Sequence, residues 1–191
     1  MAGILTDRQI RALCMSDQPL IEPFSARVSG EGVASYGLQP CGYDLRLAPE
    51  ILIFDWTKAQ GRTIDPLVPP DPDFYFQKSA DPHFDVPPRG FVAGMSLEYL
   101  RFPPNITADG KAKNVYTRTG LQMLISSINP GWKGRLHLHI ANPTPIPIRV
   151  YGNQGIVYLQ FVELGENCET SYGELLEPRF QGQTSFLPAP S

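Results

Sequence analysis

Two segments, Lys113-Asn-Val-Tyr-Thr-Arg-Thr-Gly120 and Ser126-Ser-Ile-Asn-Pro-Gly-Trp-Lys-Gly134, form the centre of this chain. The second runs directly into Arg135-Leu-His-Leu-His-Ile-Ala-Asn142, where apolar and polar residues alternate with the period of a β-strand. Asn129-Pro-Gly-Trp132 is typical of a turn, because proline fixes φ at the first central position and glycine tolerates the next. Polar residues, a turn and a strand in this order predict a site that holds a small polar ligand against a rigid sheet.

The size and charge of the chain narrow its class. Its 191 residues suit one domain, 1–191, with a proper core. A net charge of -3 argues against a general nucleic-acid binder, which shows a basic stripe. We find no apolar run long enough for a membrane span and no signal peptide. The cysteines at 14, 41 and 168 are odd in number and widely spaced, so we expect free thiols and a cytoplasmic location.

Segments along the whole chain predict a mainly β fold. Twenty prolines favour many short strands and turns over long helices. We expect strands at 43–47, 51–54, 90–100, 121–125, 135–142, 146–151 and 156–164. Gly42, just before the first of these, indicates a bulge or a close backbone approach. Strands this short and evenly spaced predict an all-β barrel or sandwich.

The remaining segments are less regular. Thr6-Asp-Arg-Gln9 is a capping box and predicts a short helix from about Asp7 to Cys14. Residues 30–39, rich in glycine and small polar side chains, predict a loop, and residues 106–113 show no pattern. Residues 55–88, rich in proline and aspartate, predict a long excursion with one short strand. Residues 177–191 form a polar, proline-rich tail with too few apolar residues for a core of its own.

His137 and His139 lie two apart on a predicted strand, so both project from one face. Two imidazoles on one face are a possible start of a metal site, but His83 is the only other histidine and no carboxylate stands out as a ligand. We therefore predict no metal held by the protein. Zinc-dependent nucleobase deaminases need His-x-Glu and Pro-Cys-x-x-Cys, and this chain contains neither. Phosphate-loop and dinucleotide glycine signatures are also absent from the sequence.

Two groups of residues are candidates for binding an anion. Arg118 lies among polar residues before a glycine and a strand, where a planar guanidinium suits phosphate oxygens. A plain surface arginine explains it equally well. In the tail, Arg179 and Gln183 flank Gly182, and such a segment is suited to close over an anionic ligand. From composition alone, a disordered end is the simpler interpretation of the tail.

Several motifs in the right order resemble the dCTP deaminase branch of the trimeric dUTPase superfamily. The residues that carry the resemblance are Cys41-Gly-Tyr-Asp-Leu45, Lys113–Gly120, Asn129–Gly134, Gly155–Phe161, and the shorter Leu5–Ile10, Ile21–Phe24 and Ser35–Leu38. The match covers nearly the whole chain, tail included, and only Asp55–Pro88 matches poorly. No single motif is decisive, but the ordered set is a strong signal.

The resemblance implies a fold, an assembly and a ligand. The fold is a dUTPase-like distorted β-barrel, jelly-roll-like, with a short N-terminal helix and a C-terminal tail. The assembly is a homotrimer with active sites at subunit interfaces, where the tail, about 177–191, closes over a deoxynucleoside triphosphate. The resemblance also implies Mg²⁺ held through the bound triphosphate, without zinc.

Carried over residue by residue, the resemblance implies a catalytic and a substrate-binding set. The implied catalytic residues are His139, Arg118 and Asn114. The implied substrate-binding residues are Lys113, Ser126, Ser127, Asn129, Trp132, Tyr172, Arg179 and Gln183. Within this second set, the two serines contact the base, and the tyrosine, arginine and glutamine of the tail contact the triphosphate.

In the tail, Arg179 replaces the usual lysine and keeps its positive charge, and three further positions depart from the family pattern. His139 replaces a glutamate on the strand after the turn, Asn114 replaces a serine that helps to position the water, and Asn129 replaces an acidic residue. Zinc-free deamination needs a group that takes a proton from water and returns it to the leaving nitrogen. Histidine, with a reference pKa of about 6.5, is competent for this transfer but aims its nitrogens differently from a carboxylate.

Three hypotheses follow from this combination. In the first, the chain is a dCTP deaminase-like hydrolase that acts in dUTP biosynthesis and uses His139 to transfer the proton. Alternatively, it is a nucleotide hydrolase with another substrate, such as a dUTP diphosphatase or an enzyme for a modified pyrimidine. The third hypothesis is a nucleotide-binding trimer that has lost catalysis.

Overall fold

Antiparallel β-strands make up most of the fold, and the computed structural model describes residues 2–68, 71–78 and 81–186. The strands are β1 (Gly3–Ile4), β2 (Ile21–Glu22), β3 (Val28–Gly30), β4 (Val33–Gln39), β5 (Gly42–Phe54), β6 (Tyr75–Lys78), β7 (His83–Val86), β8 (Gly90–Arg101), β9 (Ile106–Ala112), β10 (Gln122–Leu124), β11 (Lys133–Asn142), β12 (Ile148–Tyr151) and β13 (Gly155–Glu163). The helical elements are α1 (Asp7–Cys14), α2 (Trp56–Ala59), η1 (Pro72–Phe74), α3 (Asn114–Thr117) and η2 (Tyr172–Glu174).

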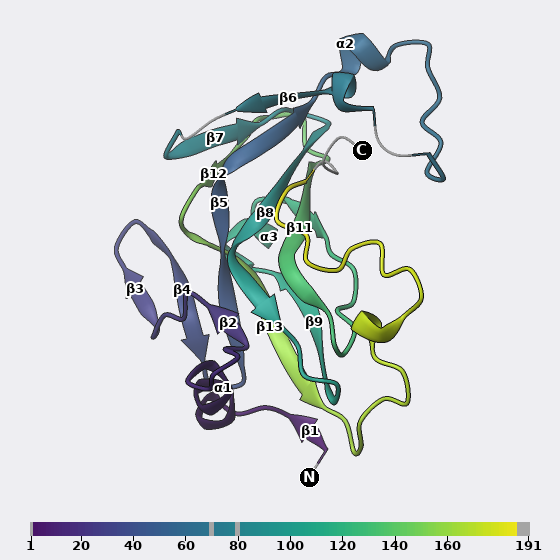
Figure 1. The fold of residues 1–191 in the computed structure, drawn as a ribbon. Coiled ribbons are helices and arrows are strands. Elements are labelled where there is room, and N and C mark those ends of the chain that lie inside the picture. The colour runs from purple at the N-terminus through teal and green to yellow at the C-terminus, as the bar shows by residue number, and fades with distance from the viewer. Residues whose placement is uncertain (1, 69–70, 79–80, 187–191) are drawn as a thin grey trace.

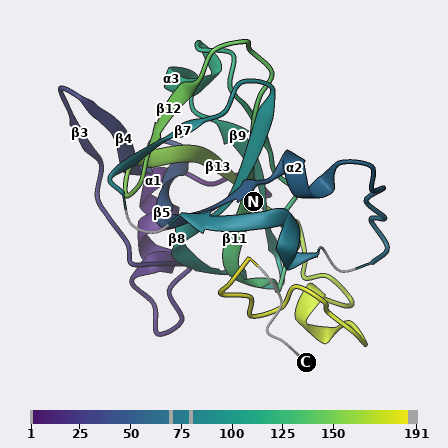
Figure 2. The same cartoon turned by 90° about the horizontal axis from the view of Figure 1, so that it is seen from above.

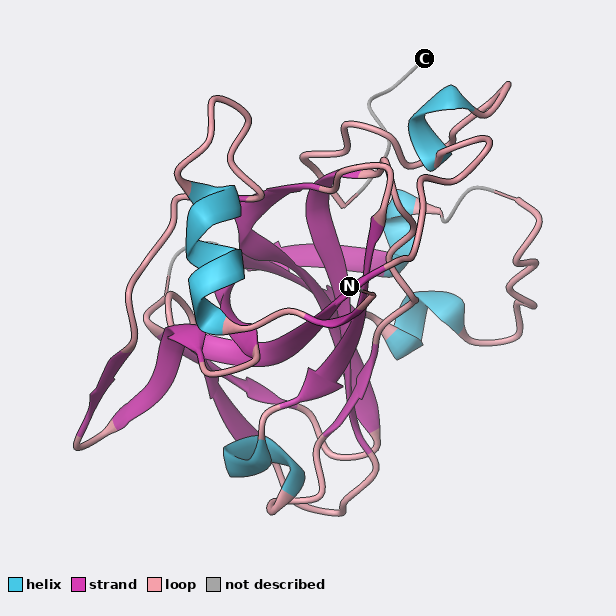
Figure 3. Cartoon of the chain, turned by 90° about the horizontal axis from the view of Figure 1, so that it is seen from below, coloured by secondary structure: helices cyan, strands magenta, loops and turns pink. Residues whose placement is uncertain are grey.

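One long sheet dominates the described part of the chain. Its central path runs β1-β13-β5-β8-β11-β10, while β7 and β12 pair separately in a two-stranded sheet. The first half of β5 pairs with β4 and β13, and its second half pairs with β6 and β8. Because β5 pairs with β4 and β13 at one end and with β6 and β8 at the other, the sheet curls. The curl is visible in Figure 1 and, along the barrel, in Figures 2 and 3. The predicted mainly β, barrel-like fold is confirmed.

Alternation along the strands separates the core from the outer face. On β11, Leu136, Leu138 and Ile140 are buried in the hydrophobic core, whereas the residues between them point to the opposite face and are only partly covered. The core also takes in residues from β5, β8 and β13, including Tyr43 and Phe161, both fully buried. The outer face of β11 is therefore held on a packed sheet but left open for polar side chains.

The predicted N-terminal helix is confirmed with the same bounds, Asp7–Cys14. The side chain of Gln9 accepts a hydrogen bond of 3.0 Å from the backbone N–H of Thr6, as a capping box requires. Leu5 and Ile10, on either side of this cap, are both buried. The helix lies against the curled sheet (Figure 3), and no helix in the described residues is long and apolar enough to cross a membrane.

Several boundaries differ from the sequence prediction. The expected loop at 30–39 contains strand β4, and the patternless segment at 106–113 contains strand β9. The two strands expected at 43–47 and 51–54 form one strand, β5, with a shift of register between Leu47 and Ile51. The bulge absorbs the residues that break the alternation, so the strand continues through them.

The excursion after β5 is more structured than predicted. It holds α2, η1, β6 and β7 where one short strand was expected, and residues 69–70 and 79–80 lie outside the described part. Phe54 contacts the rings of Trp56, Phe74 and Tyr75, which joins the excursion to the sheet. The prediction for Gly42 is confirmed, since a Cβ atom there would lie 2.4 Å from the backbone oxygen of Leu159.

Candidate functional site

The outer face of β11 presents Arg135, His137 and His139 in a row. Burial lowers the pKa of both histidines below their ordinary value of 6.5. Both imidazoles are therefore neutral at neutral pH, and a neutral imidazole has one nitrogen that accepts a proton and one that donates. His139 pairs across the sheet with Ala93 of β8 and Leu124 of β10.

A cavity of about 480 Å³ opens beside these histidines. Its wall includes His137 and His139 from the strand, and its other polar residues come from the preceding turn and the tail. Those polar residues are Ser126, Ser127, Asn129, Tyr172 and Gln183, and Trp132 lines the cavity as well. Hydroxyl, amide and imidazole groups around a partly apolar space suit a small polar heterocycle.

The turn before β11 is fixed by its own backbone. The backbone N–H of Trp132 donates to the carbonyl of Asn129 at 3.2 Å, and Gly131 has a φ of 78°, a value that favours glycine. The buried indole of Trp132 donates through Nε1 to the carbonyl of Phe180 at 2.8 Å. The predicted turn is thus also the anchor for the C-terminal segment.

The C-terminal segment docks along β11 of the same chain (Figure 1). Gln183 bonds twice to Arg135, its backbone oxygen accepting at 2.9 Å and its Nε2 donating to the carbonyl of Arg135 at 3.0 Å. The hydroxyl of Tyr172 accepts from the backbone N–H of Phe180 at 3.2 Å. Backbone and amide contacts such as these need no apolar core, which is why composition did not predict them.

A second cavity, of about 460 Å³, lies where β9 ends and α3 begins. Lys113 and Asn114 line it together with Ser35 and Asp44. The ammonium group of Lys113 forms an ion pair with the buried Asp44 and donates to Ser35 at 3.2 Å. Burial raises the pKa of Asp44, and the neighbouring Lys113 opposes that rise.

The sequence-implied residues thus divide between two surfaces of one chain. The structure brings His139 together with the two serines, Asn129, Trp132, Tyr172 and Gln183 around the first cavity. It places Lys113 and Asn114 at the second cavity. Arg118 caps the C-terminal end of α3 and Arg179 lies in the tail, and both are exposed and line neither cavity.

Sequence reasoning missed three residues that contact these groups. Asp44 was quoted only as part of a motif, although its ion pair with Lys113 links positions 69 residues apart. Ser35 was likewise quoted only as part of a motif, although it accepts a hydrogen bond from Lys113. Phe186, whose ring centroid lies 5.5 Å from that of His139, stood in a tail without readable pattern. Within the described residues, no three His, Cys, Asp or Glu side chains are grouped to hold a metal.

The fold and site define a curled antiparallel β protein with polar cavities on its outer surface, and known structures share this fold. The crystal structure of 2'-deoxycytidine 5'-triphosphate deaminase from Agrobacterium tumefaciens matches 85% of this chain with a TM-score of 0.63. The sequence identity is 20%, so this likeness concerns the fold. This chain spans 48% of the Agrobacterium chain.

Sequence comparisons identify the family. A dCTP deaminase-like family model matches residues 4–164. A dCTP deaminase of Chloroflexus aurantiacus is 35% identical over 184 residues, covering 96% of each chain. A dCTP deaminase of Sulfurovum sp. is 35% identical, covering 95% of this chain and 94% of its own, and one of Campylobacter jejuni is 32% identical, covering 95% of each. This chain belongs to the dCTP deaminase-like family, whose named relatives are enzymes.

Proposed function

We propose that this chain is a hydrolase that deaminates the cytosine base of dCTP to give dUTP and ammonia. The observation that carries the proposal is the neutral, half-buried His139 at the wall of a cavity that Ser126 and Ser127 also line. A pyrimidine held by the serines would present its C4 edge towards the imidazole. The relatives named dCTP deaminase support the choice of substrate.

His139 can supply the proton transfers that this reaction needs. The oxygen of a water molecule attacks C4, and the basic nitrogen of the imidazole takes a proton from that water. The imidazolium passes this proton to ring N3, which gives a tetrahedral C4 with a hydroxyl and an amino group. The imidazole then moves the hydroxyl proton to the amino nitrogen, the C4–N bond breaks, and ammonia leaves as the C4 carbonyl forms. Atoms balance, because the oxygen of one water becomes the carbonyl oxygen and its two protons end on N3 and on the released ammonia. A low pKa favours the first step, since the imidazole must begin neutral.

A complete site needs groups from both cavities, and we propose that a homotrimer supplies them. Asn114 and Lys113 would orient the water and the phosphate chain, while His139 acts on the base. One chain carries these residues on separate surfaces, which supports a site shared between two copies. Exposed Arg118 lies at the end of α3, immediately after the second cavity, and would reach the shared site from there.

The polar groups of the two cavities suit a magnesium ion carried by the substrate better than one held by the protein. The described residues offer imidazoles, hydroxyls and amides around the first cavity, and the carboxylate of Asp44 in the second is paired with Lys113. Mg²⁺ prefers oxygen ligands and keeps several waters. We propose that Mg²⁺ enters with the triphosphate and offsets its charge, while Arg179 and Gln183 contact the phosphates.

A second candidate rests on the three departures from the family pattern. His139, Asn114 and Asn129 replace a carboxylate, a hydroxyl and an acidic group, so the base side of the site is less acidic than the pattern implies. Such a site suits a different pyrimidine or hydrolysis of the phosphate chain, as in a dUTP diphosphatase. If no triphosphate reacts, a nucleotide-binding trimer without catalysis remains.

The test is a turnover assay with Mg²⁺ that follows ammonia and pyrophosphate separately. The substrates are dCTP, dUTP, dTTP and dCTP methylated or hydroxymethylated on the base. We expect ammonia from dCTP without pyrophosphate, and a loss of roughly a hundredfold or more in kcat for His139→Ala. His83→Ala is the matched control, because His83 is exposed on β7 and lines neither cavity.

Other outcomes would reassign the function. Pyrophosphate from dUTP would favour the diphosphatase, and ammonia from a modified cytosine would favour a retuned deaminase. Unchanged ammonia release in His139→Ala would contradict the role of this residue. A shift in thermal stability on adding dCTP without any turnover would indicate binding alone.

A further inference from the structure

The ring of Phe186 lies against both histidines of β11. Its centroid is 5.0 Å from that of His137 and 5.5 Å from that of His139, and the second pair meets edge to face at 86°. Tyr75 of β6 also contacts this ring, with its centroid 5.8 Å from that of Phe186. The tail thus meets a residue of the excursion and the proposed proton-transfer residue at one point.

Cross-strand register explains why this space was open for an aromatic ring. Leu52 of β5 pairs with Ala93 of β8, which pairs with His139 of β11, so these three side chains form a row on the outer face. The methyl group of Ala93 is too short to support an imidazole beside it, yet Ala93 is fully buried. Phe186 lines a cavity together with Ala93 and Leu52, so the small alanine leaves open space on the face that the Phe186 ring reaches.

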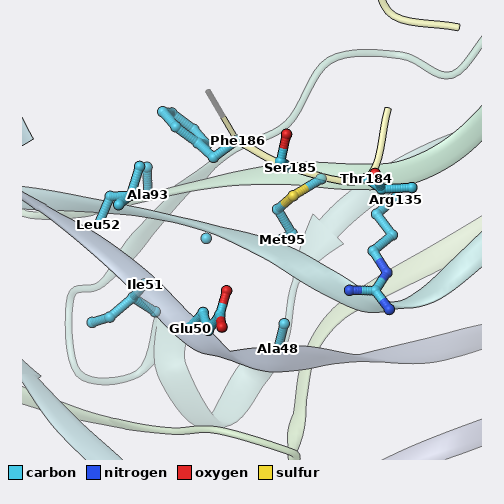
Figure 4. A pocket seen from close by; sticks show the side chains of 11 residues that line it. Ala48, Glu50, Ile51, Leu52, Ala93, Met95, Arg135, Thr184, Ser185 and Phe186 are labelled. Carbon is cyan, nitrogen blue, oxygen red and sulfur yellow. The ribbon is translucent and has the colours of Figure 1, made fainter. Parts of the chain in front are cut away.

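Two cavities lie near this contact, one lined by the histidines and one lined by Phe186. The 480 Å³ cavity has the imidazoles in its wall, and a neighbouring cavity of about 210 Å³ has Phe186 but neither histidine. Figure 4 shows the smaller cavity with Thr184, Ser185 and Phe186 along one side and β5 along the other. Because Phe186 does not line the larger cavity, a base bound there would meet His139 while Phe186 contacts the same imidazole from outside the cavity lining.

His137 fixes the tail that carries this ring. Its Nε2 lies 3.2 Å from the backbone oxygen of Ser185, and a carbonyl oxygen only accepts, so Nε2 carries the proton and donates. That bond holds the residue next to Phe186 on the strand. Both histidines line the larger cavity, but they then have different tasks, because His137 anchors the tail and His139 is left for proton transfer.

We propose that Phe186 is a positioning residue for His139, with Tyr75 and the His137–Ser185 hydrogen bond holding Phe186 in place. This inference rests on the proposed deamination, in which His139 moves the proton. The ring contact restricts rotation of the imidazole and keeps water from its supported side. A displacement of roughly 1 Å at a reacting group costs about a hundredfold in rate, so such support matters for catalysis.

Among the residues that the structure describes, few charged or titratable groups lie around His139, and Tyr172 of the tail lines the larger cavity with it. His137 and Arg135 lie on the same strand, Tyr75 contributes a phenol from β6, and Glu50 of β5 lies across the smaller cavity. On the adjacent strands β8 and β10, the partners of His139 are Ala93 and Leu124, which do not titrate. Burial is the cause of the lowered pKa of His139, and Phe186 is part of what buries it.

The experiment compares Phe186→Ala with Phe186→Tyr, which keeps the ring. For Phe186→Ala we expect kcat with dCTP to fall by roughly ten- to a hundredfold and KM to change by less than about threefold, because ground-state binding is retained. The acidic limb of the pH–rate profile should move up towards 6.5, since water then reaches the imidazole. Phe186→Tyr should restore both values, and Leu176→Ala, at a fully exposed tail position, should match the wild type.

An NMR pH titration of the His139 ring in the free protein separates this inference from the proposed function. The midpoint should rise in Phe186→Ala and stay at the wild-type value in Phe186→Tyr, whether or not dCTP is turned over. Thermal unfolding of each variant shows that the fold is intact. A wild-type midpoint in Phe186→Ala would overturn the positioning role. Absence of deamination in the wild type, with the midpoint shifted as expected, would count against the proposed function only.

Discussion

The two candidate cavities of this chain are built in opposite ways. The larger lies on the face of a packed sheet and offers neutral groups, with His139 on a strand whose neighbours are fixed by register. The other lies at the junction between β9 and α3 and holds a lysine–aspartate ion pair. Lys111, at the same cavity, adds a further cation.

This difference matches the demands of the proposed reaction. Proton transfer to a base atom requires a ring held within tenths of an ångström, and sites on strands achieve this better than sites on loops. Charge on a phosphate chain acts over a longer distance and tolerates a looser support. The comparison suggests that the neutral sheet face handles the base and the charged junction handles the phosphates.

The strongest test of this division mixes two inactive chains. Arg118→Ala and His139→Ala should each lose roughly a hundredfold or more in turnover. Co-expressed in equal amounts, they should recover about a quarter of wild-type turnover, because random assembly of a ring gives one interface in four both intact residues. The measurement is ammonia release per subunit after purification.

A matched pair of variants controls for this result. His139→Ala mixed with His139→Gln should stay inactive, since both lesions lie on the same half of the site. No recovery in the first mixture would mean that each chain carries its own complete site, whereas recovery in the control would mean that turnover does not require His139. The division between base-binding and phosphate-binding surfaces would then be wrong.

The next prediction concerns the ion pair at the junction. Asp44→Ala leaves the ammonium of Lys113, whose side chain is 12% exposed, without its partner. Breaking a buried ion pair on one side costs about 3–5 kcal/mol of unfolding free energy. The double variant Asp44→Ala with Lys113→Met should regain most of this loss, because no uncompensated charge remains.

Urea unfolding of the wild type, the Asp44→Ala variant and the double variant measures these differences in unfolding free energy. A single variant as stable as the wild type would show that Lys113 turns to water, and the charged cavity would then be a plain surface hollow. Equal losses in the single and double variants would point to packing around Asp44 as the cause.

The strands were largely predictable, because the alternation of apolar and polar residues along a strand involves only residues close together in the sequence. The alternation from Arg135 to Asn142 predicted β11, and the Asn129–Trp132 turn before it was equally plain. Strand β4 was missed because it contains glycine and serine. Gly37 within it has a φ of 90°, and a Cβ atom there would lie 2.2 Å from the backbone oxygen of Ala26, so the glycine allows two segments to meet.

The sequence predicted which residues belong to the site, but not how they are arranged in space. The family resemblance identified His139, Lys113 and Asn114. Sequence periodicity, however, does not show which residues far apart in the chain come into contact. The contact between Lys113 and Asp44 depends on the curl of the whole sheet. The docked tail was equally hidden. Its anchors are backbone carbonyls and the indole of Trp132, and such contacts leave no hydrophobic pattern.

The smallest expected effect concerns that anchor. Trp132→Phe keeps an aromatic side chain in the core but removes the hydrogen bond from Nε1 to the carbonyl of Phe180. We expect a loss of about 0.5–1.5 kcal/mol in unfolding free energy and faster proteolysis between Tyr172 and Phe180, because the tail loses one of its attachments to the neutral cavity. Limited proteolysis with mass spectrometry measures this directly. The Lys113 cavity lies apart from the tail, so the Lys113→Ala variant should leave the cleavage rate unchanged. Equal acceleration in both variants would mean that the two surfaces are coupled within one chain, and the contrast between them would no longer hold.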